Sequence, residues 1–317
     1  MVDRSAFAAL ATAGGDGGAA RALTRGLKSE LAAHDLQRLA ALWIFAAASA
    51  PETLAEIYDG ALEGWRGEAV RAAPVCLIRR PGEPIPAAFW TALWALIDTP
   101  PGTLGAGGVT QRTAELGARL ASGLRERAGP CALAYPGCAE AAAAGYPARF
   151  TLPALAACPP GSLGGAFHRL IVDNGFDLEV LDRDALGLAD LPAPHAYLNA
   201  RILQCHDLWH IVGGYRTTGL HEVAISAFQA GQFGHTYSAM LLAMVLTRAA
   251  FEAPQSANLL LDVILSAWAH GRESPPLLGV AWETLWDQPV ELVRTQLGVA
   301  AYVSPWPADL FEQMHAA

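Results

Sequence analysis

Four residues between positions 206 and 222 have the types and the spacing of a metal site. His206 and His210 stand four residues apart, so in a helix both imidazoles lie on one face, one turn apart. Asp207 comes three residues before His210, and the three side chains fall within an arc of roughly 100°. One helix can present several ligands to one ion in this way. We therefore predict a divalent metal bound by His206, Asp207, His210 and Glu222.

Glu222 can join these ligands only if the chain folds back. Along a straight helix, at about 1.5 Å per residue, it would lie about 18 Å from His210. Gly213-Gly214 supplies a break, because glycine readily takes the positive φ of a helix C-terminus. The sequence thus predicts a helix, a loop of about seven residues from Gly213 to Gly219, and a second helix whose first turn carries Glu222.

The chemistry of this site is open at the level of the residues. Two histidines and a carboxylate suit zinc, which we place first, and also non-haem iron or another divalent ion. Asp207 and Glu222 are the catalytic candidates, because a carboxylate that does not bind the metal could move a proton. His206-Asp207-x-x-His210 also looks like the HExxH of zinc hydrolases, with an acid one methylene shorter. Helix-capping or core histidines are the structural alternative.

Apolar residues that recur every three or four positions predict helices along most of the chain. Such patterns cover residues 19–48, 86–97, 110–127 and 259–270, and alanine, leucine and tryptophan are frequent. The stretch 129–160 is rich in Pro, Gly and Ala, and we place a boundary there. We predict an all-α multi-helix bundle with a helix-loop-helix metal site. Its parts are an N-terminal helical region (1–130) without an assigned role, a domain that carries the metal motif (155–300) and a C-terminal tail (301–317).

The helix that carries Glu222 is expected to continue to Leu246 and to be apolar on most faces. Such a helix is either central in a fold or exposed to lipid. Phe228, Met240 and Met244 are candidates for a wall along a lipid tail, with ordinary core packing as the alternative. Gln229 lies seven residues after Glu222, on the same face. It either points into a metal cavity or is a buried amide bonded to a neighbouring backbone.

Composition excludes several classes of protein. The 21 Lys+Arg against 30 Asp+Glu leave a net charge of −9 without a basic run, so we expect no nucleic-acid partner. Five cysteines, none spaced as CxxC, favour a reduced, cytoplasmic protein. No window reaches the roughly 18 to 20 uninterrupted apolar residues of a membrane span, so any membrane contact should be peripheral.

The metal motif and its surroundings resemble the coenzyme Q (ubiquinone) biosynthesis protein four family. The family signature, HD, two residues, H, eleven residues, E, is met at His206, Asp207, His210 and Glu222. The resemblance covers roughly residues 155 to 300. The further segments that carry it are Pro160-Gly-Ser-Leu-Gly164 with Phe167, then His270-Gly271-Arg272, Trp282-Glu283 and Pro289 to Gly298.

Two residues of this region stand apart from the signature. Arg272, in the downstream segment, is a further site candidate. His221 departs from the family pattern, which often has Gly before the glutamate, and it is either a bystander or another ligand.

The resemblance implies an all-helical protein, peripheral to a membrane, that binds a divalent metal at the four signature positions. Its substrate would be a polyprenylated benzoquinone-ring precursor or another isoprenoid lipid. The implied activity is removal of the ring carboxyl at C1 with hydroxylation of that carbon. Family members are also described as scaffolds for the other ubiquinone-biosynthesis enzymes. A lipid-binding scaffold with a structural metal is therefore the alternative to a metal-dependent enzyme, and a zinc-dependent hydrolase ranks behind both. We expect a location in the cytoplasm, or peripheral at the inner membrane.

Overall fold

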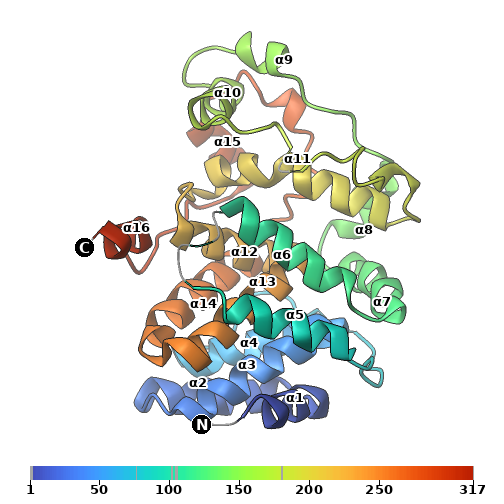
Figure 1. Cartoon of the computed structure of the whole chain (residues 1–317). Helices are drawn as coiled ribbons and strands as arrows, with labels where there is room; N and C mark the ends of the chain where they lie inside the picture. Colours follow the sequence, from blue (N-terminus) through green and yellow to red (C-terminus); the bar gives the residue numbers. More distant parts are fainter. Residues whose placement is uncertain (1–2, 76, 101–102, 104–105, 180, 317) are drawn as a thin grey trace.

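The chain folds into helices that stack from one end of the molecule to the other (Figure 1). The computed structural model describes residues 3–75, 77–100, 103, 106–179 and 181–316. Over these residues every regular element is a helix, and the only strand-like pairing is an isolated bridge between Ser162 and Pro289. The predicted all-α class is confirmed. None of the helices described is both long enough and apolar enough to cross a bilayer.

The first half of the chain supplies the lower part of Figure 1 and the helices that flank it. Asp3 and Asp16 start the first two helices, since each carboxylate accepts a hydrogen bond from a backbone N–H of the first turn. The helices of this half are α1 (Arg4–Ala13), α2 (Gly17–Ser29), α3 (Ala33–Ala48), α4 (Leu54–Arg66), α5 (Ala87–Ile97), α6 (Ala106–Ala118), α7 (Ser122–Leu133) and α8 (Cys138–Ala143).

The second half forms the centre and the upper part of the molecule. The hydroxyl of Ser162 accepts a hydrogen bond from the N–H of Gly165 and starts α10, as the resemblance of this segment to a helix start implies. The helices of this half are α9 (Leu152–Ala156), α10 (Leu163–Asn174), α11 (His195–Gly213), α12 (Gly219–Phe233), α13 (Thr236–Glu252), α14 (Ala257–Glu273), α15 (Val290–Leu297) and α16 (Leu310–Ala316).

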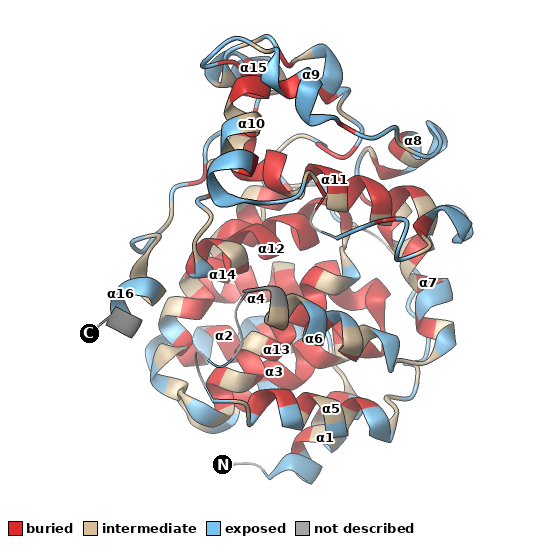
Figure 2. Cartoon of the chain, turned by 45° about the horizontal axis from the view of Figure 1, so that its top comes forward, coloured by how far each residue is buried: buried red, intermediate tan, exposed pale blue. Residues whose placement is uncertain are grey.

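One hydrophobic core runs through both halves. The helix α12 is buried along most of its length, and it packs against α13 and α14 (Figure 2). In turn α13 packs on α3, and α14 packs on α4. Three rings continue across this contact, with centroids 4.3 Å apart between Trp43 and Tyr58 and 4.7 Å apart between Tyr58 and Trp268. The core contains residues from both sides of the stretch 129–160. The predicted division there remains a prediction.

The predicted single helix from Glu222 to Leu246 is wrong, because the chain breaks at Gly234. Gly234 has a φ of 62°, and its N–H bonds to the carbonyl of Ala230, which ends α12. A Cβ at this position would also lie 2.6 Å from the ring of Tyr135. A glycine is thus needed for both conformation and space. The predicted helix over residues 110–127 is likewise two helices, α6 and α7.

Two glycines let α12 and α14 approach each other closely. A Cβ on Gly271 of α14 would clash with the backbone carbonyl oxygen of Phe228 in α12. A Cβ on Gly231 of α12 would lie 2.9 Å from the carbonyl oxygen of Trp268 in α14. The backbones of these helices are therefore in direct contact, and α14 sets the position of the helix that carries Glu222.

Candidate metal centre

Two helices and a tight loop bring the metal motif together. The helix α11 carries both histidines of the motif and ends at Gly213. Gly214 follows with a φ of 78°, and its N–H bonds to the carbonyl of His210. The chain then returns, and α12 carries Glu222 in its first turn. The predicted helix, glycine break and returning helix are all observed, with a loop of residues 214–218 that is shorter than expected.

The C-terminal end of α11 is held by residues that follow it in the chain. Arg294 of α15 donates hydrogen bonds to the carbonyls of Val212 and Ile211, at 2.9 and 2.6 Å. The N–H of Tyr302 donates to the carbonyl of Gly213 at 2.7 Å. These three carbonyls have no partner within the helix, so the contacts both satisfy them and fix where the helix ends.

The N-terminal end of α12 is held in the same manner by the last residues of the chain. The N–H of Gly219 donates to the carboxylate of Glu312 in α16, at 2.8 Å. The hydroxyl of Thr218 donates to the carbonyl of Ala308 at 2.6 Å. A carboxylate at this position satisfies a free N–H and also complements the positive end of the helix dipole. The predicted C-terminal tail thus contacts the helix that carries Glu222.

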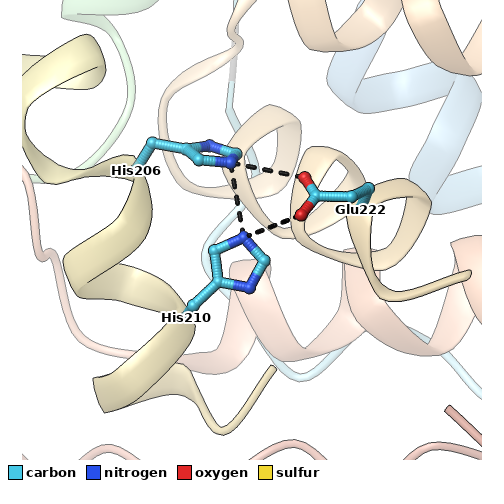
Figure 3. Close-up of side chains that lie close together, drawn as sticks. All are labelled: His206, His210 and Glu222. Carbon is cyan, nitrogen blue, oxygen red and sulfur yellow. Dashed lines mark hydrogen bonds and ion pairs between the residues drawn. The ribbon is translucent and has the colours of Figure 1, made fainter. Parts of the chain in front are cut away.

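Three of the four predicted ligands converge on one point (Figure 3). The Nε2 atoms of His206 and His210 are 3.3 Å apart. One carboxylate oxygen of Glu222 lies 3.4 Å from Nε2 of His206, and the other lies 3.4 Å from Nε2 of His210. Ligand atoms about 2.0–2.1 Å from a metal lie about 3.3–3.4 Å apart in a regular tetrahedron. The donor atoms of these three residues are therefore close enough together to bind one ion.

The cluster is open on one side. The His210 side chain is 0% exposed, whereas the Glu222 side chain is 41% exposed. Burial alone would raise the pKa of Glu222, but hydrogen bonds with His206 and His210 outweigh it and hold the pKa well below its usual value. The pKa of His206, which burial would lower, is raised by Glu222. Glu222 is thus an anion that faces both imidazoles, as a metal ligand must be.

Asp207 and His221 lie apart from this cluster. The oxygens of Asp207 are not among the ligand atoms that gather here, and burial raises the pKa of its carboxyl despite the nearby His206 and His210. His221 accepts a hydrogen bond at Nδ1 from the N–H of Arg216, at 2.8 Å. Helix spacing predicted Asp207 as a ligand because it lies within the same arc as the two histidines. An arc defines the direction of a side chain from the helix axis, but not the position of its terminal atoms.

Gln229 contacts the ring nitrogen of His206 that does not face the candidate metal ligands. Its Nε2 lies 2.7 Å from Nδ1 of His206, on the side of the ring that faces away from the cluster. The sequence places Gln229 on the correct face, with a cavity or a backbone as its partner, but the observed partner is a ligand. Two residues that the sequence analysis missed continue the contact, Ser238 and His235. No spacing connects them to Glu222, because they follow the break at Gly234.

The candidate lipid-binding residues lie in the packed core. Phe228 packs against the rings of Tyr215 and His270, with centroids 5.6 and 5.1 Å away. Met240 and Met244 are buried on α13, the helix that packs against α3. Their role toward a lipid stays a prediction.

Arg272, the remaining candidate, faces α4. It bonds to the carboxylate of Asp59, with both contacts at 3.3 Å, and to the carbonyl of Ala73. It is not part of the cluster around His206.

The fold and the site together define a protein whose described regular elements are all helices, with a candidate metal centre between two consecutive helices of one motif. Residues 147–302 match the sequence model of the coenzyme Q (ubiquinone) biosynthesis protein Coq4 family. This part of the chain belongs to that family, and it contains all the residues of the motif.

Individual relatives agree with this assignment. Residues of this chain are 32% identical over 149 residues to the ubiquinone biosynthesis protein COQ4, mitochondrial, of Eremothecium gossypii. They are 33% identical over 150 residues to the mitochondrial COQ4 homolog of Drosophila ananassae. The matches cover 46% of this chain and 43% and 53% of the two relatives. The chain thus spans about half the length of the curated relatives that it matches.

A solved structure shares the fold. It is the crystal structure of a Nostoc punctiforme protein described provisionally as a ubiquinone biosynthesis protein, with a TM-score of 0.51 and 23% sequence identity. The similarity covers 96% of that chain and 68% of this one, a larger share than residues 147–302 make up. The similarity in fold therefore extends to helices outside the family match.

Proposed function

We propose that this chain is a metal-dependent protein of ubiquinone biosynthesis that acts on a polyprenylated benzoquinone-ring precursor. The observation that supports the proposal is the convergence of His206, His210 and Glu222 within a segment that belongs to the Coq4 family. Two helices from one motif, each held at its end by other parts of the chain, keep these three ligand atoms together. The reaction proposed is C1 decarboxylation with hydroxylation of that carbon.

Zinc is the metal that we propose, because two imidazoles and a carboxylate are a common donor set for it. The donor atoms lie 3.3–3.4 Å from one another, close enough to bind one ion. Iron or another divalent ion is the alternative. Zinc has no redox chemistry, so with zinc the oxidative step at C1 would depend on dioxygen reacting with the electron-rich ring.

Each residue of the site has a distinct part in this proposal. The bound ion would act as a Lewis acid for a carboxylate or phenolate oxygen of the substrate as CO2 leaves. His210, fully buried, anchors the site from the inside, and the half-exposed Glu222 lies at the side from which a substrate can enter. Asp207, a buried carboxyl with a raised pKa, is the nearby group that could hold a proton.

A scaffold with a structural metal is the second candidate function. The ligands come from α11 and α12, so an ion between them would cross-link two helices whose ends are already fixed. In this case the protein would bind an isoprenoid lipid and organise the other ubiquinone-biosynthesis enzymes at a membrane surface. The zinc hydrolase ranks behind both, since the acid of His206-Asp207-x-x-His210 is one methylene shorter than the glutamate of HExxH, which would draw a general base away from a metal-bound water.

The proposed partners and location follow from the same family. They are a prenylated quinone precursor, the other enzymes of ubiquinone biosynthesis and the surface of the inner membrane. The relatives from Eremothecium and Drosophila are named as mitochondrial proteins. Peripheral contact is the form of membrane association that we propose for this chain.

Metal analysis of purified variants tests the proposed site. We expect about one zinc per chain in the parent protein and in Asp207→Asn, and little in His210→Ala, because His210 supplies a fully buried ligand. Equal and negligible metal in the parent and in His210→Ala would contradict the proposal.

A second experiment separates the enzyme from the scaffold. Each variant is expressed in a strain that lacks its own protein of this family, and its quinone content is measured. An enzyme requires Glu222 for the reaction, so Glu222→Ala should stay folded, keep bound lipid and fail to restore quinone synthesis. A variant that loses thermal stability and lipid together would favour the scaffold.

A further inference from the structure

A row of buried or partly buried polar groups begins at His206, on the side of its ring away from Glu222, and ends at the start of the next helix. Nδ1 of His206 is 2.7 Å from Nε2 of Gln229, and Oε1 of Gln229 is 3.4 Å from the hydroxyl of Ser238. That hydroxyl is 2.8 Å from Nδ1 of His235. Gln229 is 2% exposed and Ser238 is 0% exposed, so bulk water does not reach the two middle groups of the row. The break at Gly234 turns the chain so that His235 and Ser238 lie beside Gln229.

Each group in this row can reverse its role. The amide of Gln229 can turn over, because its carbonyl and its NH2 group have nearly the same shape. The Ser238 hydroxyl can donate in either direction. Burial lowers the pKa of His235 to about 3, so His235 is neutral and changes only the nitrogen that carries its proton.

A metal at the cluster allows only one direction of the row. If His206 binds through Nε2, its proton must be on Nδ1, and Nδ1–H needs an acceptor. The carbonyl of Gln229 is the acceptor within reach, and its NH2 group then faces Ser238. The hydroxyl of Ser238 accepts that hydrogen bond and donates a hydrogen bond to Nδ1 of His235. His235 must then carry its proton on Nε2.

The metal-free arrangement is the reverse. When the imidazole of His206 is neutral, the NH2 group of Gln229 donates to its Nδ1, so its proton is on Nε2, directed at Glu222. The hydroxyl of Ser238 donates to the carbonyl of Gln229 and accepts from Nδ1–H of His235. In this arrangement the nitrogen needed for the metal is occupied by a proton.

We propose that Gln229 is a positioning residue that selects the metal-binding tautomer of His206, and that metal binding reverses the hydrogen bonds from His206 through Ser238 to His235. This inference rests on the proposed metal site. It assigns to Gln229, Ser238 and His235 a role that neither the motif nor the family match indicates. It also predicts that metal binding at His206, His210 and Glu222 changes the tautomer of His235, a residue that does not bind the metal.

The chain offers a matched control for Gln229. Gln232, one turn further along α12, is also a buried amide, but it bonds to the carbonyls of Gly271 and Ser274 and to the N–H of Leu277. Gln232→Leu removes buried hydrogen bonds from the same helix without touching His206. Gln229→Glu is the conservative variant, since a carboxylate can only accept from Nδ1–H.

Zinc affinity, measured by competition with a chelating dye, is the first readout. We expect Gln229→Leu to bind zinc about 10- to 100-fold more weakly, as is usual when the hydrogen-bond partner of a metal-bound histidine is lost. Gln229→Glu should bind as tightly as the parent protein or more tightly. Gln232→Leu should keep the parent affinity although it is less stable.

The tautomers of the parent protein are the second readout, and they do not depend on any variant folding. In protein labelled with 15N-histidine, zinc should move the proton of His206 to Nδ1 and that of His235 from Nδ1 to Nε2. Parent protein that binds no zinc would overturn both the metal site and this inference. Zinc binding with an unchanged His235 tautomer, and with equal affinity in Gln229→Leu, would overturn the inference alone and leave the metal site in place.

Discussion

Burial and neighbouring charge give the histidines of this chain different protonation properties. Burial lowers the pKa of His221, His235 and His270, so each is neutral in the folded protein near neutral pH. His206 is partly buried, which would lower its pKa, yet the hydrogen bond and the charge of Glu222 raise it. Of these four imidazoles, only His206 has a raised pKa, and His221, His235 and His270 act as neutral hydrogen-bonding groups.

His235 predicts an acid sensitivity for the metal-free protein. Its folded pKa of about 3 is below the value near 6.5 of an unfolded histidine, so between these values the unfolded state binds one more proton. The free energy of unfolding should therefore fall as the pH falls, by about 1.4 kcal/mol per pH unit for this proton. Urea unfolding with a chelator present, from about pH 7 to pH 5, measures the slope. His235→Gln should reduce the slope by about one proton, and an unchanged slope would contradict the assignment.

At the scale of single elements, the approach of α12 and α14 matters most to the site. These helices touch through Gly231 and Gly271, where no side chain separates their backbones. The Glu222 carboxylate is in the first turn of α12, so its position relative to the histidines of α11 depends on this contact. Packing at the far end of α12 is thus part of what positions the ligand.

Gly271→Ala tests this close contact. The added methyl group would meet the carbonyl of Phe228, and since both belong to helix backbones, the helices must separate. We expect a loss of about 2–3 kcal/mol in the free energy of unfolding, as is typical of overpacking. Gly26→Ala is the control, because Gly26 is an exposed residue within α2 and its Cβ would meet nothing within 4 Å. That variant should gain about 0.5–1 kcal/mol, and similar values for the two variants would contradict the role of the contact.

The elements of the motif were predictable from local rules. The spacing of His206 and His210, the glycine pair and the returning glutamate depend on helix geometry within one short segment. The break at Gly234 was not, because apolar residues continue on both sides of it and a lone glycine can also sit inside a helix. The space there is filled by the ring of Tyr135, which the local sequence does not show. The sequence predicts the candidate lipid-binding residues on one helix because it does not show this break. In the structure Phe228 belongs to α12 and Met240 to α13.

At the scale of the whole molecule, an ion pair between a buried arginine and a partly buried aspartate joins the two halves of the chain. Asp59 of α4 accepts hydrogen bonds from Arg272 and from the indole N–H of Trp268, both in α14. The ring of Trp268 also packs against Tyr58. The sequence separation of 213 residues between Asp59 and Arg272 explains why the sequence alone did not assign a role to the first half.

Asp59→Asn tests how strongly the halves depend on each other. Arg272 would keep its buried charge without a counter-charge, so we expect unfolding to become easier by about 3 kcal/mol. Denaturant unfolding measures this change, and a single transition would show that the two halves still unfold together. Asp98→Asn, which breaks the exposed pair with Arg4, should have a much smaller effect. Equal effects of the two variants would contradict a special role for the pair of Asp59 and Arg272.

The packing of α13 on α3 and of α14 on α4 has a consequence for how this protein can diverge. A metal ligand must be one of a few residue types at one position, whereas a covering helix needs only apolar side chains of suitable volume, which many sequences provide. Helices that serve as a cover can therefore change their sequence extensively while they keep their place. Residues 147–302, which match the family model, make up only part of the shared core, and residues on both sides of them contact α12, which carries Glu222, and α14, which packs against it.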